Sequence, residues 1–355
     1  MKQFLSSAFF GGLLLTSPVF GQTRYTTIDL GLSPTARSTA GAKIGNGQQV
    51  GYSFMNSPVH ALLWSGSAST VVDLHPSSLP AGSTSAAYGV GGGQQVGFAN
   101  SRAALWFGSP DSYVDLHPAA GFSDSTALMS NGSQQIGSGT TTAGHPHALL
   151  WSGSAAGAID LHPTGGGWIN SYGNAISGNF QVGSIDGGSG QGHAVIWAGS
   201  PRIVADLHQS KYVYTEARAM YGNQQVGTGN VMASAGHGFV TTSNHALLWT
   251  GTASSLVDLH PAGFTDTFGT GAGVGKQVGF GMTPTSTNCP PSCSVNHALV
   301  WSGSTSSMLD LNQFLPAGYT DAQAYGIDPQ GNIVGMASND SAHNLWHAVM
   351  WIPLN

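Results

Sequence analysis

Charged side chains are scarce in this chain. Asp, Glu, Lys and Arg make up 7% of its 355 residues, and Glu216 is the single glutamate. The nine Lys and Arg residues are scattered singly, without the basic patch that follows a phosphate backbone, so nucleic acid is not an expected partner. So few charged helix formers, together with 52 glycines, favour short strands and turns over helices.

Cysteine is also rare, and the apolar runs are short. Cys289 and Cys293 lie in one stretch, where an oxidising compartment favours a local disulfide over the alternative of two free thiols. An apolar stretch, "FLSSAFFGGLLL", follows Lys2 and is too short to cross a bilayer comfortably. It predicts an export signal over residues 1–21, and therefore a secreted protein, extracellular or periplasmic, with no membrane span.

One repeated phrase dominates the rest of the chain. The sequence "HALLWSGSASTVVDLHP" at 60–76 returns as "HALLWSGSAAGAIDLHP" at 147–163 and as "HALLWTGTASSLVDLHP" at 245–261. A Gln-Val-Gly-like core occurs seven times, and each copy is followed by a tryptophan. Successive tryptophans are 42 to 52 residues apart, close to the ~40–50 residues of a four-stranded propeller blade.

Each repeat contains four short alternating segments, which in the first repeat are "STAGAKI", "QQVGYSF", "HALLW" and "VVDLH". The last repeat stops at "WIPLN" without an Asp-Leu strand, whereas residues 25–31, "YTTIDLG", supply such a strand at the front. We therefore predict an all-β protein, a single seven-bladed β-propeller over residues 22–355, closed by the N-terminal strand completing the last blade. This closure leaves no exposed sheet edge.

The combination of His-Ala-Leu-Leu-Trp with a preceding "QQVG" and a following "DL" resembles the bacterial extracellular HAF-repeat proteins, over nearly the whole mature chain. The resemblance implies a repeat class and an extracellular location. It implies no shared catalytic residue set.

Positions used in every repeat are interpreted as structural. The tryptophans are expected to pack between blades rather than stack on a ligand, and the Asp of each Asp-Leu pair to accept structural hydrogen bonds. Histidines 15 residues apart, such as His60 with His75 and His147 with His162, should face each other across adjacent strands. They form either a structural pair or two metal ligands, and two ligands alone rarely hold zinc, so no metal and no cofactor is expected.

Deviations between repeats are where specific function is expected. Repeats three to seven share an aromatic-x-polar pattern at the link into the first strand, on the face where the second-to-third-strand loops also emerge. These residues are candidate ligand contacts, with packing between blades as the alternative: Phe122, Asp124, Trp168, Asn170, Tyr214, Glu216, Phe264, Asp266, Tyr319 and Asp321. The loops of repeats five and six are the longest, and they contain His237, Phe239 and both cysteines.

The sequence predicts a secreted, non-catalytic propeller that binds an extracellular glycan or protein on this face. One alternative is a carbohydrate-active enzyme, a polysaccharide lyase or glycosidase, with Glu216, Asp266 and Asp321 as the candidate catalytic carboxylates. Another is a purely structural extracellular repeat protein. No nucleophile elbow, zinc motif or phosphate loop supports an enzyme class directly.

Overall fold

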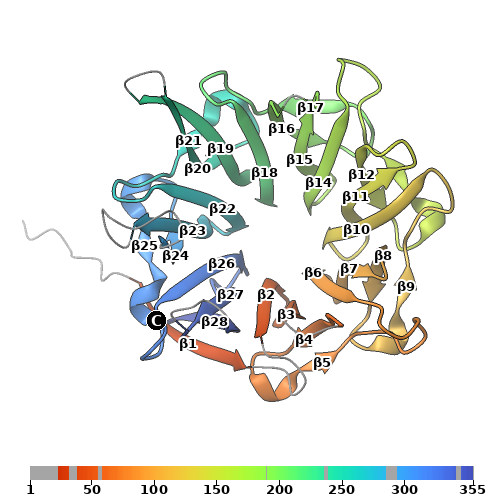
Figure 1. The fold of residues 1–355 in the computed structure, drawn as a ribbon, viewed down its shortest axis with the longest axis horizontal. Helices are drawn as coiled ribbons and strands as arrows, with labels where there is room; N and C mark the ends of the chain where they lie inside the picture. The colour runs from red at the N-terminus through yellow and green to blue at the C-terminus, as the bar shows by residue number, and fades with distance from the viewer. Residues whose placement is uncertain are drawn as a thin grey trace, which may run out of the picture.

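The computed structural model describes residues 23–31, 38–54, 58–188, 190–235, 239–284, 294–340 and 345–354. Over these ranges, seven four-stranded antiparallel sheets stand in a ring around a central channel (Figure 1). The prediction of a seven-bladed β-propeller is confirmed. Among the described residues, no helix is long and apolar enough to cross a membrane.

The first six blades are each built from four consecutive strands, from the inner strand at the channel to the outer strand at the rim. Blade 1 contains β2 (Ser38–Gly45), β3 (Gln48–Phe54), β4 (Ala61–Trp64) and β5 (Val72–Asp73). Blade 2 contains β6 (Ser85–Gly91), β7 (Gln94–Ala99), β8 (Arg102–Trp106) and β9 (Val114–Asp115). Blade 3 contains β10 (Phe122–Ser130), β11 (Gln135–Thr141), β12 (Pro146–Trp151) and β13 (Ile159–Asp160).

The other blades follow the same order. Blade 4 contains β14 (Asn170–Ser177), β15 (Phe180–Asp186), β16 (Gly192–Trp197) and β17 (Ile203–Asp206). Blade 5 contains β18 (Tyr214–Tyr221), β19 (Gln224–Ala235), β20 (Phe239–Trp249) and β21 (Val257–Asp258). Blade 6 contains β22 (Asp266–Gly273), β23 (Lys276–Pro284), β24 (Ser294–Trp301) and β25 (Leu309–Asp310). Short 3-10 turns precede or follow several outer strands: η1 (Ala68–Thr70), η2 (Pro110–Ser112), η3 (Ala155–Gly157), η4 (Ala253–Ser255), η6 (Thr305–Ser307) and η7 (Leu311–Phe314).

Blade 7 joins the two ends of the chain. It contains β26 (Asp321–Ile327), β27 (Ile333–Ser338) and β28 (Trp346–Leu354), and its outer strand is β1 (Arg24–Gly31). β1 pairs antiparallel with β28 from Arg24 opposite Leu354 onward, and Leu30 is buried against blade 1. The expected closure by the N-terminal strand is therefore confirmed.

The repeated tryptophans form the core between blades, as expected. All seven are fully buried: Trp64, Trp106, Trp151, Trp197, Trp249, Trp301 and Trp351. Trp106, for example, packs with Val50, Leu63 and Leu74 of the preceding blade. Burying a ring of this size stabilises the fold by several kcal/mol, on the order of 2–3 for a large apolar side chain. Each tryptophan thus fixes one blade to the next.

The glutamine of the repeated core holds the turn after the tryptophan in blades 1 to 6. Gln49 is buried, and its Oε1 accepts a hydrogen bond from the Gly66 amide at 2.8 Å. The equivalent glutamines of blades 2 to 6 make the same bond at 2.6–2.8 Å. The polar residue in this otherwise apolar strand is therefore satisfied, and it sets the turn geometry.

Candidate binding site in the central channel

Every inner strand carries one extra residue opposite the repeated glycine. In blade 2, Ala87 pairs with Gly97 and Gly89 pairs with Val96, so Tyr88 between them has no partner. The same register shift occurs in all seven inner strands. Such a β-bulge redirects a side chain out of the sheet pattern. The seven bulge residues are Ala42, Tyr88, Leu128, Asn174, Arg218, Thr270 and Tyr325.

The repeated glycine is what permits the bulge. A Cβ on Gly97 would lie 1.8 Å from the carbonyl oxygen of Ala86, which the bulge turns toward the second strand. The corresponding distance is 1.7–2.0 Å at all seven repeated glycines. No other residue fits there without moving the inner strand. The glycine of the Gln-Val-Gly core therefore maintains the display of one side chain per blade.

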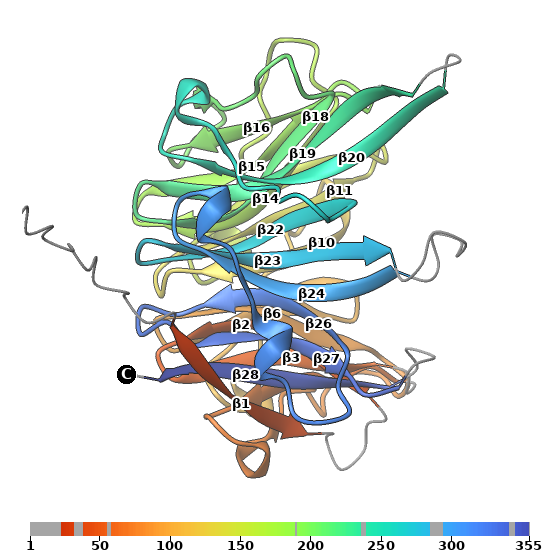
Figure 2. The ribbon, with the colours of Figure 1, turned by 90° about the vertical axis from the view of Figure 1, so that its left-hand side faces the viewer.

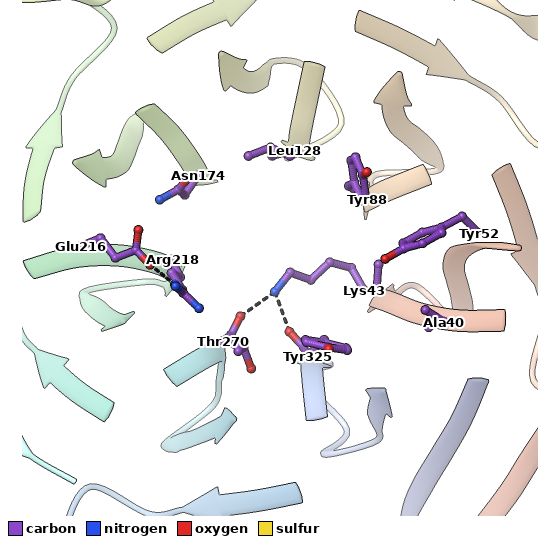
Figure 3. Close-up of a pocket in the computed structure, with 12 residues that line it drawn as sticks. Ala40, Lys43, Tyr52, Tyr88, Leu128, Asn174, Glu216, Arg218, Thr270 and Tyr325 are labelled. Atoms are coloured by element: carbon purple, nitrogen blue, oxygen red, sulfur yellow. Dashed lines mark hydrogen bonds and ion pairs between the residues drawn. The ribbon is translucent and has the colours of Figure 1, made fainter. Parts of the chain in front are cut away.

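All seven bulge residues line one cavity of about 430 Å³ in the central channel (Figure 3). The other described residues around it are Ala40, Gly41, Lys43, Tyr52 and Glu216. The structural framework repeats, but the bulge residues include two tyrosines, an arginine, an asparagine and a leucine. A sevenfold scaffold thus carries a chemically asymmetric pocket.

The pocket lies around the middle of the inner strands. Lys43 is one residue past the bulge, whereas Ala40 and Glu216 lie two residues before it, toward the start of the inner strands. The inner strands start on the face where the second-to-third-strand loops emerge. On that side the β19–β20 and β23–β24 hairpins extend beyond the body of the ring (Figure 2).

Two cationic side chains point into the pocket. The Nζ of Lys43 donates hydrogen bonds to the carbonyl oxygens of Thr270 and Tyr325, each at 2.6 Å (Figure 3). Desolvation by burial, with the nearby charge of Arg218, lowers the pKa of Lys43 to about 8. Lys43 reaches blades 6 and 7 from blade 1, so it also ties the inner strands together across the channel.

Arg218 and Glu216 form an ion pair on the same strand. The Nε of Arg218 donates to Oε1 of Glu216, and the Tyr214 hydroxyl donates to Oε2 at 3.0 Å. The guanidinium also lies over the Phe268 ring, 5.8 Å from its centroid. The carboxylate is held on both oxygens and orients the arginine toward the channel.

Aromatic rings cover one side of the pocket. Tyr52 and Tyr88 meet edge to face with centroids 5.7 Å apart, and Tyr325 meets Phe280 in the same way at 6.2 Å. Burial, with the nearby ionisable hydroxyl of Tyr52, raises the pKa of Tyr88 to about 12, and burial likewise raises that of Tyr325. These phenols stay neutral and offer apolar faces with hydrogen-bonding hydroxyls.

Of the ten candidate contacts predicted from the sequence, Glu216 is the one that lines this pocket. Four of the aromatic candidates instead pack edge-on against the third-strand histidine of their own blade, with centroids 5.1–6.4 Å apart: Phe122, Trp168, Phe264 and Tyr319. In blade 5 the ring at the equivalent position is Tyr212 and not Tyr214. The Tyr212 hydroxyl donates to Asp258. The four rings also pack against hydrophobic clusters that join neighbouring blades, which are the contacts of the packing alternative.

The polar partners in that pattern hold neighbouring strands. Asp266 accepts hydrogen bonds from the backbone and side chain of Asn244, each at 2.9 Å. Asp321 is fully buried and accepts from the Asn296 amide. Asp124 accepts from the Thr140 amide, and Asn170 donates to Asp186. Neither Asp266 nor Asp321 joins Glu216 at the pocket, so the three candidate catalytic carboxylates are not brought together.

The histidine pairs face each other as expected and belong to a repeated hydrogen-bond chain. In blade 1, Nδ1 of His60 donates to Asp73 at 2.7 Å, and Asp73 accepts the His75 amide at 2.8 Å. His75 in turn hydrogen-bonds to Ser85 of the next blade at 2.9 Å, and Ser85 accepts the Ala61 amide. The Asp-Leu aspartate therefore acts as the expected structural acceptor.

The pair of His147 and His162 repeats this arrangement in blade 3, with Asp160 and Ser171 as partners. Over the described residues, no group of three or more His, Cys, Asp or Glu side chains is placed to hold a metal ion. Cys289, Cys293 and His237 lie outside the described residues, as does the side chain of Phe239.

The repeat motifs do not single out the bulge residues, although the sequence carries a signal for them. They lie nine residues before the repeated glycine in six repeats and ten before it in the seventh. No single residue type is common to all seven repeats at that position. Comparing repeats position by position, rather than searching for shared letters, would have pointed to the channel.

Solved structures similar to this chain are propellers of low sequence identity. A manganese complex of oligogalacturonate lyase matches with a TM-score of 0.54 at 8% identity, covering 94% of this chain and 97% of that one. Oligogalacturonate lyase from Vibrio parahaemolyticus gives 0.52 at 7%, covering 93% and 97%. The polysaccharide lyase Uly1 gives 0.50 at 9%, covering 92% and 91%. No family model and no curated protein matches the sequence. These likenesses show the propeller fold.

Proposed function

We propose that this chain is an exported, extracellular or periplasmic propeller of the HAF-repeat type that binds a glycan in its central pocket without transforming it. The observation that carries the proposal is the ring of seven bulge residues, which differ from blade to blade around one cavity of about 430 Å³. A pocket of this size, with a few convergent polar groups on aromatic walls, suits a small ligand better than a flat protein surface.

The side chains in the pocket match the surface of a sugar. Tyr52, Tyr88 and Tyr325 offer ring faces for the apolar side of a pyranose, and the hydroxyls of Tyr52 and Tyr88 remain neutral donors. Arg218 and Glu216 offer hydrogen bonds to ring hydroxyls. The long β19–β20 hairpin extends beyond the ring, and we expect it to contact a longer glycan, or its protein carrier, that enters the channel from that face.

Binding is favoured over hydrolysis because the pocket has one carboxylate among its described lining residues. A glycosidase needs two carboxyl groups ~5–10 Å apart. Both carboxylate oxygens of Glu216 are also already engaged, one by Arg218 and one by the Tyr214 hydroxyl.

A glycan array followed by calorimetry on the hits tests the proposal. Tyr88→Ala should weaken binding at least tenfold. Tyr221→Ala changes an exposed tyrosine at the end of β18, outside the pocket, and should leave binding unchanged. Loss of binding on shortening the β19–β20 hairpin, with Tyr88→Ala silent, would move the site to the loops. Release of shorter or unsaturated products from a bound glycan would replace binding by catalysis.

A further inference from the structure

The central pocket concentrates positive charge in an acidic protein. The chain has a formal net charge of −6 and nine Lys and Arg residues in all. Two of these nine, Lys43 and Arg218, line the pocket, with Glu216 as the one acidic group among the described lining residues. The local balance is therefore one positive charge in a narrow, partly desolvated site, where electrostatic fields act strongly.

Both cations keep donors available for a ligand. Lys43 uses two of its three N–H groups on the carbonyl oxygens of Thr270 and Tyr325. Arg218 bonds Glu216 through Nε, and within the described part of the chain its two terminal amino groups have no hydrogen-bond partner. Its side chain is 37% exposed. An arginine fork beside an ammonium suits a carboxylate, which accepts several charge-assisted hydrogen bonds at once.

Each cation is also held in place. Lys43 is anchored by carbonyls of blades 6 and 7, and Arg218 by the Glu216 carboxylate and the Phe268 ring. Holding two positive charges near each other in a pocket costs stability, because the charge of Arg218 disfavours the charged form of Lys43. An anionic ligand would remove that cost, and preorganised donors bind it without losing further side-chain entropy.

We propose that the natural ligand of the central pocket is an acidic oligosaccharide, one of whose uronate carboxylates binds between Lys43 and Arg218 while a sugar ring lies against the tyrosines. This rests on the proposed glycan binding and adds the ligand's charge. The cavity of about 430 Å³ is much larger than a small inorganic anion needs, and binding such an anion does not require an aromatic wall.

The experiment compares two oligosaccharides of equal length, oligogalacturonate and the neutral oligogalactoside, by calorimetry on the protein lacking residues 1–21. The acidic oligosaccharide should bind at least tenfold more tightly, and its affinity should fall as salt is raised from 20 to 500 mM, both values being experimental settings. Lys43→Met and Arg218→Gln should each lower the ratio of the affinities for the acidic and the neutral oligosaccharide roughly tenfold. Lys276→Met, a matched change at the start of β23 outside this pocket, should leave it intact.

The outcomes separate the two proposals. Equal binding of both oligosaccharides, weakened by Tyr88→Ala, would overturn the acidic ligand and leave glycan binding standing. Binding of neither would overturn glycan binding itself. Acid preference unaffected by Lys43→Met and Arg218→Gln would place the carboxylate elsewhere and overturn the site. Inorganic phosphate or acetate binding as tightly as oligogalacturonate would identify a simple anion site instead. If Lys43→Met fails to fold, Arg218→Gln and the salt series still decide.

Discussion

The imidazole rings of His60 and His75 lie flat against each other in blade 1, with centroids 4.1 Å apart and planes 6° from parallel. Blades 3, 4 and 5 repeat the stack at 3.9–4.0 Å. Two imidazoles this close repel each other if both are charged. The third-strand histidine has a carboxylate partner, so the fourth-strand histidine is the one that stays neutral.

Acid should therefore weaken the fold. Burial lowers the pKa of five fourth-strand histidines, with the adjacent third-strand cation adding to the effect: His75, His117, His162, His208 and His260. A folded pKa below the unfolded ~6.5 means that the unfolded chain binds protons more tightly, so stability is complete above ~6.5 and falls as the pH drops below it. The raised pKa of His297, caused by Asp310, acts in the opposite direction but is a single group.

The melting temperature should fall progressively from pH 6.5 to 5, and by much less from pH 8 to 7, where the lowered pKa of Lys43 makes a small contribution; all four pH limits are experimental settings. His208→Asn should make this decline shallower, whereas His145→Asn, at an exposed loop histidine of another blade, should not. A melting temperature that is unchanged or higher at pH 5 would refute the neutral-histidine account.

At the junction between blades 6 and 7, Asn312 and Ala322 stand where the preceding junction has His260 and Thr267. At the preceding junction, the Thr267 hydroxyl accepts the Ala246 amide and bonds His260. At the 6–7 junction, Ala322 has no hydroxyl, and Oδ1 of Asn312 accepts the Ala298 amide at 2.9 Å.

Asn312→His alone should therefore cost about 1–3 kcal/mol, because it leaves a buried amide unpaired. Adding Ala322→Thr should recover most of that loss by rebuilding the arrangement of the other junctions. Urea unfolding of the two single variants and the double variant measures the coupling free energy. Strictly additive effects would show that the two positions do not compensate each other.

Closure by β1 should contribute strongly to stability. β1 pairs with β28 along its length and buries Tyr25 and Leu30. Its Asp29 carboxylate accepts hydrogen bonds from His347 and Tyr319. Deleting residues 22–31 should lower the melting temperature far more than removing residues 1–21 alone, because it exposes a sheet edge. Leu30→Ala should cost about 2–5 kcal/mol, and Val204→Ala, at a position 47% exposed, much less. An unchanged melting temperature after the deletion would argue against closure.

The repeated glycines should tolerate no side chain. Gly137→Ala places a Cβ 2.0 Å from the Thr126 carbonyl oxygen, so the inner strand must shift. We expect a loss of about 1–3 kcal/mol or more in the free energy of unfolding. Gly165→Ala is the control, since its Cβ would meet nothing within 4 Å. Equal stability of the two variants by urea unfolding would show that the bulge is not constrained by glycine.

The architecture was readable from the sequence because a propeller repeats its local physics. Strand alternation, the spacing of Trp64 and its counterparts, and the displaced Asp-Leu strand at Asp29 each follow from short-range patterns that any blade must satisfy. The histidine pairs were found for the same reason, since a constant hairpin length places them opposite each other.

The pocket was identified from the tertiary structure, although variation among the repeats at one position marks its bulge residues in the sequence. The sequence places Lys43, Arg218 and Tyr325 nearly three hundred residues apart at the extremes, and ring closure brings them around one channel. Arg218 and Tyr325 face inward because of a register shift of one residue. The repeated glycine permits this shift but does not by itself predict it, because a bulge depends on the backbone of the neighbouring strand. The sequence by itself determined the blades, their number and their closure. The tertiary structure decided which side chains face the channel, and hence where a ligand can bind.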